Sequence, residues 1–179
     1  MANLTVVHNE WVNLDKPGGQ VFFVGGGTVA YKGKGASDSN SGLNPKQAFS
    51  TIQKGLDSTI TGRGDTVAIL PGSITTTASL TMTKDDVTLT AAQAVGSRQY
   101  PNVTIVSTLA GSLLTIDANN VTVDSILFDD NTTSSTSAAA VIDVNSSSTG
   151  EDFSGVRILN CTLECTGSTD SDRDGITLG

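Results

Sequence analysis

Short apolar strands recur along the chain, and stretches rich in Ser, Thr, Asn and Gly separate them. One series begins at Val87 (Val-Thr-Leu-Thr), Val121 (Val-Thr-Val-Asp) and Val156 (Val-Arg-Ile-Leu). The starts of these strands are 34 and 35 residues apart (121 − 87 = 34; 156 − 121 = 35). A repeat of this length predicts a coiled, stacked architecture, because a β-sandwich has no reason to repeat at a fixed spacing. We therefore expect Val87, Val121 and Val156 to lie in one stacked parallel sheet.

A second series of apolar strands interleaves with the first. It begins at four residues whose spacing varies with the loops between them: Leu80, Leu113, Val141 and Ile176. The second and third copies of the first series continue as further strands, Ser125-Ile-Leu-Phe and Asn160-Cys-Thr-Leu. In a parallel β-helix each strand stacks on its equivalent one coil away, so loops can lengthen outward without disturbing the stack. The pattern predicts about three coils of such a structure.

One short segment has helical periodicity. Ser50-Thr-Ile-Gln53 matches a capping box, in which the Ser50 hydroxyl accepts from the Gln53 amide and the Gln53 side chain reaches back. Ile52 and Leu56 then follow at the spacing of one apolar helix face. We expect a helix near residues 50–58 that covers the open end of the β-helix, just before the first strand at 66–70.

The composition supports an all-β protein. Thr, Ser, Gly and Asn together make up 75 of the 179 residues, and these types favour turns, caps and strands over helix interiors. The formal net charge of −8 argues against a protein that binds nucleic acid through its phosphates. The hydrophobic share of 37% and the charged share of 16% argue against disorder.

Cysteine usage and the N-terminal residues bear on the compartment. Cys161 and Cys165 would lie about 13 Å apart in a strand, too far for a disulfide, so we predict thiols that fill a core stripe. The N-terminus has neither the basic nor the apolar region of a signal peptide. The apolar run at 21–24 breaks at three glycines, far too early to span a bilayer. The sequence therefore predicts neither secretory export nor membrane insertion.

Three blocks of sequence carry a resemblance to a known superfamily. They are Gly35-Ala-Ser-Asp-Ser-Asn-Ser-Gly42 followed by Pro45, then Ala48-Phe-Ser-Thr-Ile-Gln53, then Gly64-Asp-Thr-Val-Ala-Ile-Leu-Pro-Gly72. Over about residues 33–179 the chain resembles the pectin-lyase-like superfamily, in which such blocks form the first turn, the capping helix and the first strand. The resemblance implies a right-handed, single-stranded parallel β-helix over 35–179, with one N-terminal capping helix. It implies no single activity, because this fold carries lyases, hydrolases, epimerases and viral adhesins.

Two missing features direct the resemblance toward virion proteins. The chain has no export signal, and it lacks the His-Gly pair and the Arg-Ile-Lys sequence typical of pectate lyases and polygalacturonases. In character it is most similar to phage tailspike and virion fibre proteins, which leave the host by lysis. That similarity implies that residues 1–34, with Trp11, Phe22, Phe23 and Tyr31, form an N-terminal virion-attachment segment.

The last residues, Asp174-Gly-Ile-Thr-Leu-Gly179, begin a strand that has no cap. An uncapped coil exposes its core and its strand edges, so we expect either a symmetric partner or further polypeptide to cover it. Of these two, we favour a longer protein that forms a homotrimer.

Three acidic residues near the C-terminus form a candidate calcium site. Asp170, Asp172 and Asp174 have the Asp-x-Asp-x-Asp-Gly spacing in which alternate carboxylates converge on one hard cation. A solvated acidic turn that begins a new coil is the alternative, since no flanking helix is predicted. No other cofactor is predicted.

Four further aspartates are candidates for a catalytic groove. Asp129 and Asp130 follow a strand, and Asp124 and Asp143 lie nearby in the sequence. Glycosidases of this fold hold paired acids in such places, but neighbouring side chains on a strand point to opposite faces. A solvated loop edge is the alternative that the sequence favours, so we expect these residues not to form an active site.

Arg63-Gly64-Asp65 is a tripeptide with an adhesion role in other proteins, but here it overlaps the turn that opens the first strand. A structural role explains it fully.

The leading hypothesis is therefore a non-enzymatic phage virion protein. It would form the particle-proximal part of a tail spike or fibre, or a head-decorating fibre, and take part in host attachment. Its expected partners are other virion proteins, two further copies of itself and a host surface glycan, with no nucleic acid and no membrane insertion. One alternative is a polysaccharide-degrading enzyme whose catalytic coils lie beyond residue 179, and a second is a bacterial surface adhesin.

Overall fold

The computed structural model describes residues 18–25, 35–92, 102–109, 111–131, 140–144, 154–164 and 175–178. Within them, helix is confined to α1 (Ile52–Asp57) and the short 3-10 helix η1 (Pro45–Gln47), and the other regular elements are strands. All paired strands in these residues run parallel. The prediction of an all-β protein is confirmed.

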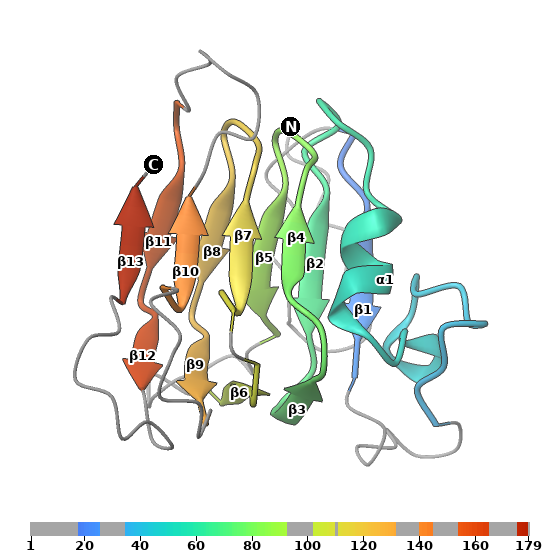
Figure 1. Ribbon diagram of the computed structural model, residues 1–179. Coiled ribbons are helices and arrows are strands. Elements are labelled where there is room, and N and C mark those ends of the chain that lie inside the picture. The colour runs from blue at the N-terminus through green and yellow to red at the C-terminus, as the bar shows by residue number, and fades with distance from the viewer. Residues whose placement is uncertain are drawn as a thin grey trace.

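The described strands form three parallel sheets (Figure 1). The first sheet contains β1 (Val21–Val24), β2 (Thr66–Ile69), β5 (Thr88–Ala91), β8 (Thr122–Asp124) and β11 (Arg157–Leu159). The second contains β3 (Gly72–Thr76), β6 (Val103–Ser107), β9 (Leu127–Asp130) and β12 (Thr162–Glu164). The third contains β4 (Leu80–Met82), β7 (Leu114–Ile116), β10 (Ile142–Val144) and β13 (Ile176–Leu178). From β2 onward the chain visits the first, second and third sheet in turn, and each strand pairs with its equivalent from the preceding round.

The register of the first sheet confirms the repeat of 34 and 35 residues that begins at Val87, Val121 and Val156. Thr88 pairs with Thr122, and Thr122 pairs with Arg157. The residues just before them, Val87, Val121 and Val156, therefore occupy equivalent positions in successive rounds, as the spacing predicts.

The register of the third sheet differs from the prediction by one residue. Leu80 pairs with Leu114, Leu114 pairs with Ile142, and Ile142 pairs with Ile176. The predicted starts, Leu113 and Val141, lie one residue earlier. Both are as deeply buried as the true strand residues, so the apolar pattern alone does not distinguish them.

One core contains inward side chains from all three sheets. The register stacks them in columns, such as Val67, Leu89 and Val123 in the first sheet, Ile74, Ile105 and Phe128 in the second, and Leu80, Leu114 and Ile142 in the third. Burial of one such side chain stabilises a fold by about 1.5–3 kcal/mol. The columns explain why a constant apolar strand form recurs in the sequence.

The corner before each strand of the first sheet explains the frequency of Asp, Asn and Gly in the turns. Before β2, β5, β8 and β11 one residue adopts the left-handed conformation: Gly64 (φ 76°), Asp86 (φ 59°), Asn120 (φ 53°) and Gly155 (φ 75°). These residue types adopt it at lower cost than others. Side chains also link the rounds, since Asp85 Oδ1 accepts from the Asn119 amide at 2.8 Å and Asn119 Oδ1 accepts from the Ser154 amide at 3.0 Å.

Helix α1 lies within the predicted range, but the predicted capping box is wrong. The N-cap is Thr51, whose hydroxyl accepts from the Lys54 amide at 3.2 Å, and Ser50 instead donates its amide to Asp38 at 2.9 Å. Thr51 still has extended backbone (φ −117°, ψ 143°), so the helix begins one residue later than the capping box predicts. Ile52 and Leu56 are buried, as their spacing predicts.

Strand β1 belongs to the first sheet, although it falls in residues 1–34, which the sequence assigned to an attachment segment. Val21–Val24 pair in register with Thr66–Ile69 of β2. On the other face of this sheet, Phe23 packs in a second apolar cluster with Ala48, Ala68 and Leu70. Phe22 and Phe23 are buried in the two apolar clusters, at 6% and 8% exposed, so they do not present an attachment surface. Trp11 and Tyr31 lie outside the described residues, so the attachment role of the rest of the segment remains a prediction.

Candidate functional site

The four candidate aspartates lie on three different sheets. Asp124 ends β8 in the first sheet, Asp129 and Asp130 end β9 in the second, and Asp143 is the central residue of β10 in the third. The structure therefore does not bring the four carboxylates into one groove.

Asp124 takes part in a link between successive rounds of the chain. Its Oδ1 accepts from Asn160 Nδ2 at 2.9 Å and from the neighbouring Ser125 hydroxyl at 3.0 Å. Asn160 and Ser125 occupy equivalent corner positions and both have left-handed backbone, with φ of 51° and 60°. This carboxylate thus stabilises the turn between the first and second sheets.

Asp129 and Asp130 point to opposite faces of the second sheet, as expected for neighbours on a strand. Asp130 is 2% exposed and lies in register with Ser107, which is also buried. Asp129 is half-buried on the outer face, in register with Val106 on one side and Glu164 on the other.

The register brings Asp129 beside Glu164, a neighbour that the sequence analysis missed. In-register side chains on adjacent parallel strands are about 5 Å apart, which is the separation found in retaining glycosidases. The other outer positions of β9 and β12 are Leu127 and Thr162, and the described part of this face carries no cationic or aromatic side chain. The pair alone does not make a substrate site. The signal that could have found it is their spacing, since residues 129 and 164 are one repeat apart.

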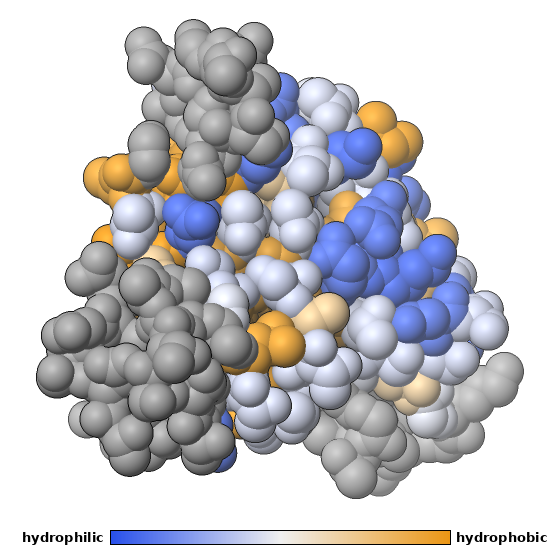
Figure 2. Space-filling model, in the orientation of Figure 1, coloured by the Kyte–Doolittle hydropathy of each residue, from blue (hydrophilic) through white to orange (hydrophobic). Residues whose placement is uncertain are grey.

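Asp143 lies in a polar row on the outer face of the third sheet. The row runs across successive strands through Thr81, Thr115, Asp143 and Thr177. Figure 2 shows that this face is pale to hydrophilic along the strands, and that hydrophobic groups gather toward the β13 side. The arrangement exposes hydroxyls and one carboxylate on an open face.

The predicted calcium ligands Asp170, Asp172 and Asp174 lie outside the described residues, so calcium binding remains a prediction. Within the described ranges, no group of three or more His, Cys, Asp or Glu side chains could hold a metal ion.

The Arg63-Gly64-Asp65 tripeptide has a structural role. The Asp65 carboxylate is 0% exposed and accepts from Arg63 Nε at 2.6 Å, Arg63 Nη2 at 2.7 Å, and the amides of Gln20 and Ile60, each at 2.8 Å. Burial raises the pKa of Asp65, but the hydrogen bonds from Arg63, Gln20 and Ile60 outweigh this effect and hold the pKa below its ordinary value. The buried carboxylate joins the residues that precede β1 and β2 and is inaccessible to a receptor.

Asp38 anchors the loop before α1 in a similar way. Its Oδ1 accepts from the amides of Ser50 and Thr51, and its Oδ2 accepts from the Thr51 hydroxyl at 2.9 Å. Partial burial raises the pKa of Asp38, but the hydrogen bonds from Thr51 and Ser50 lower it by a larger amount. The pKa of Asp38 is therefore below its ordinary value. Both oxygens are therefore occupied by protein donors.

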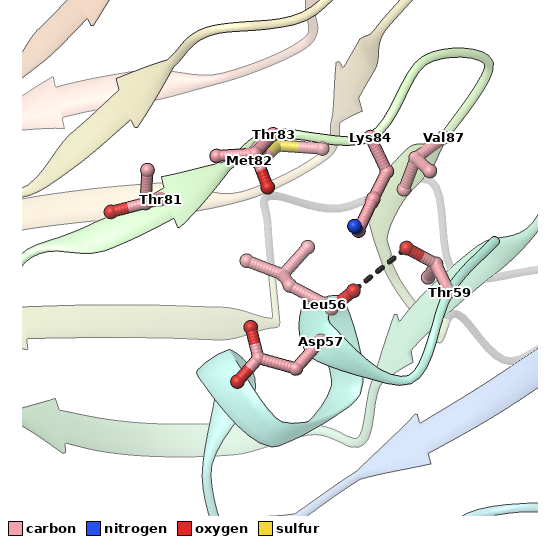
Figure 3. A pocket seen from close by; sticks show the side chains of 8 residues that line it. All are labelled: Leu56, Asp57, Thr59, Thr81, Met82, Thr83, Lys84 and Val87. Atoms are coloured by element: carbon pink, nitrogen blue, oxygen red, sulfur yellow. Dashed lines mark hydrogen bonds between the residues drawn. The ribbon is translucent and has the colours of Figure 1, made fainter. Parts of the chain in front are cut away.

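A small pocket lies between α1 and the end of β4 (Figure 3). Its lining side chains are Leu56, Asp57, Thr59, Thr81, Met82, Thr83, Lys84 and Val87. The Thr59 hydroxyl donates to the Leu56 carbonyl at 2.7 Å. The pocket is a shallow, partly open hollow, and its room for the centre of a water-sized molecule is about 10 Å³, which is about one water molecule. This pocket is too small for a substrate.

Cys161 agrees in part with the predicted core thiol. It is partly buried and packs against the main core, and its thiol donates to the Leu159 carbonyl at 3.2 Å. Burial raises the pKa of this thiol, which disfavours the reactive thiolate at neutral pH. Cys165 lies outside the described residues.

The comparisons give no family to which the chain could be assigned. It matches no protein-family model, and neither a curated protein nor a solved structure is detectably similar to it. Among the described residues, no helix has the length and the apolar character needed to cross a bilayer.

Proposed function

We propose that this chain is a right-handed parallel β-helix that acts as a structural element of a bacteriophage virion. It would form the particle-proximal part of a tail spike or fibre, or a head-decorating fibre, and take part in attachment to the host.

Two observations support the β-helix. The strands cycle through three parallel sheets in a fixed order, and each strand pairs with its equivalent from the preceding round. Connections between parallel strands are right-handed in about 98% of known cases, which favours that hand here. Helix α1 lies against β1, β2 and β4, the first strands of the stack, so we assign it the role of an N-terminal cap.

The distribution of the candidate acids is the observation that carries a structural rather than an enzymatic role. Asp124, Asp130 and Asp143 lie on separate sheets, and Asp124 bonds to a side chain of the next round. An active site needs groups that converge on one reacting bond. The described residues instead use their polar side chains to tie successive rounds together, as a stiff scaffold requires.

The proposed partners follow from the same assignment. Other virion proteins would bind the part of residues 1–34 outside β1, two further copies would complete a trimer, and a host surface glycan would be the ligand of the assembled fibre. The net charge of −8 suits an appendage that stays in solution and does not bind nucleic acid.

Electron microscopy of purified virions, labelled with gold-conjugated antibody against residues 35–179, tests this proposal. We expect label on the tail or on the head surface. Unlabelled virions, with the protein found only in the soluble part of the lysate, would contradict a virion role. Release of oligosaccharides from a host polysaccharide by the purified protein, abolished by Glu164→Gln, would identify an enzyme instead.

A further inference from the structure

The outer edge of β4 has one residue whose backbone groups face away from the sheet. The Leu80 amide donates to the Leu113 carbonyl at 2.9 Å, and the Met82 carbonyl accepts from the Asp117 amide at 2.8 Å, so both residues bond toward β7. Residues alternate between the two sides of a parallel strand. The N–H and C=O of Thr81 therefore point the other way, toward α1.

The side chain of Gln53 binds both of these groups. Its Oε1 accepts from the Thr81 amide at 2.9 Å, and its Nε2 donates to the Thr81 carbonyl at 3.1 Å. Nε2 also donates to Asp57 Oδ1 at 2.8 Å, one helical turn away, which orients the amide. A side-chain amide presents the same donor and acceptor as a peptide group, so Gln53 takes the place of a neighbouring strand.

The first sheet is closed differently at the same end of the molecule. On β1, the Phe23 amide donates to the Gly42 carbonyl at 2.7 Å, and the Phe23 carbonyl accepts from the Phe49 amide at 2.9 Å. Main chain therefore completes the edge of β1, whereas one side chain completes the edge of β4. A single substitution can remove the second closure without a change of backbone.

We propose that Gln53 and α1 cover the outer edge of β4, and that this edge pairs with β4 of a second copy of the chain when the cover is removed. In a two-fold antiparallel pair the two Thr81 residues exchange both of their N–H···O bonds, the same groups that Gln53 satisfies within one chain. β4 is Leu-Thr-Met and carries no charge, so the pairing places no like charges opposite each other in a chain of net charge −8. Exposed strand edges that lack a charge, a proline or a cover pair readily with other chains.

Hydrogen exchange and sedimentation of the full chain test the proposal. Gln53→Ala is compared with the wild type and with Gln47→Ala, a matched control because Gln47 is exposed on η1 and its side chain bonds to Ser41. We expect the exchange rate of the Thr81 amide to rise about fivefold or more in Gln53→Ala only. In urea concentrations below the unfolding midpoint, where α1 can open before the sheets unfold, this variant should also have a larger, concentration-dependent mass.

A double variant separates edge pairing from non-specific aggregation. Proline at position 81 removes the outward N–H but leaves the bonds of Leu80 and Met82 to β7. Gln53→Ala/Thr81→Pro should therefore sediment with the wild-type mass. The proposal is overturned if Gln53→Ala keeps the wild-type mass until it unfolds, or if the double variant associates as strongly as the single one.

Discussion

Side chains at equivalent positions of the third sheet are buried at one end of the described stack and exposed at the other. Leu80 and Ile176 belong to one inward column of the third sheet, and Met82 and Leu178 belong to the next. Near α1, Leu80 is 3% exposed and Met82 is 2% exposed, whereas on β13 Ile176 is 43% exposed and Leu178 is 78% exposed. The strand sequence is equally apolar at both ends, so what covers a strand, rather than its own residues, determines its burial.

The closure near α1 is built from several kinds of contact. Ile52 and Leu56 fill the end of the core, main chain completes the edge of β1, and Gln53 completes the edge of β4. The described residues of β11, β12 and β13 have a paired strand on one side only. Substitutions that remove equivalent groups at the two ends should therefore have unequal effects.

The largest difference should come from two residues of one column. Met82→Ala, at a buried position of β4 beside α1, should lower the free energy of unfolding by about 2–5 kcal/mol because it leaves a cavity. Leu178→Ala, at the exposed end of the same column, should cost less than about 1 kcal/mol. Urea denaturation measures both, and equal losses would contradict the account of burial.

The next effect concerns the polar corners. Asp65→Ala should cost about 3 kcal/mol, because it leaves the Gln20 and Ile60 amides and the Arg63 side chain without their buried acceptor. Asn160→Gly removes the exposed bond to Asp124, keeps the left-handed backbone (φ 51°) free of steric strain, and should cost about 0.5 kcal/mol. If thermal unfolding gave the same shift for both variants, the buried carboxylate would have no special role at the closed end.

A smaller effect tests the start of α1. Thr51→Ala should lower the free energy of unfolding by about 1 kcal/mol, because the hydroxyl of Thr51 caps the Lys54 amide. Thr51→Ser keeps the hydroxyl and serves as the control. If Thr51→Ala had the same free energy of unfolding as the wild type, the Thr51 hydroxyl would not be the cap of α1.

The smallest effect is the dependence of stability on acid. The pKa values of Asp38 and Asp65 are lowered in the folded chain, so each carboxylate contributes stability above the ordinary Asp pKa of 3.8. That contribution is lost as the pH falls below 3.8 through the lowered, folded values. Asp38→Asn should flatten the lower part of a plot of stability against pH, as measured by urea midpoints. An unchanged slope would mean that the bonds to Ser50 and Thr51 do not favour the ionised form.

The sequence was sufficient to predict the repeat, because strands of the first sheet share one apolar form at near-constant spacing. It was not sufficient for β3 and β6. β3 is Gly-Ser-Ile-Thr-Thr, with Ile74 as its one large inward residue, and β6 follows a longer connection that moves it out of the period. The sequence of β3 alone therefore has too few apolar residues to predict a strand, and the position of β6 alone does not follow the repeat.

The site residues were harder to place for a related reason. Asp129 and Glu164 become neighbours only through the register of β9 with β12, and Asp124 meets Asn160 only one round further along the chain. Local spacing led instead to a comparison of Asp129 with Asp130, which point to opposite faces. The partners of Gln53 were missed because a capping box explains the same residue locally.

Couplings through hydrogen bonds in the NMR spectrum of the chain test the stack most directly. The account predicts a coupling between the Thr122 amide and the Val87 carbonyl, and another between the Arg157 amide and the Val121 carbonyl, in line with N···O distances of 3.0 Å and 2.8 Å. Both would join residues one repeat apart in parallel strands. Couplings between strands adjacent in the sequence, such as β8 with β9 in an antiparallel hairpin, would contradict it.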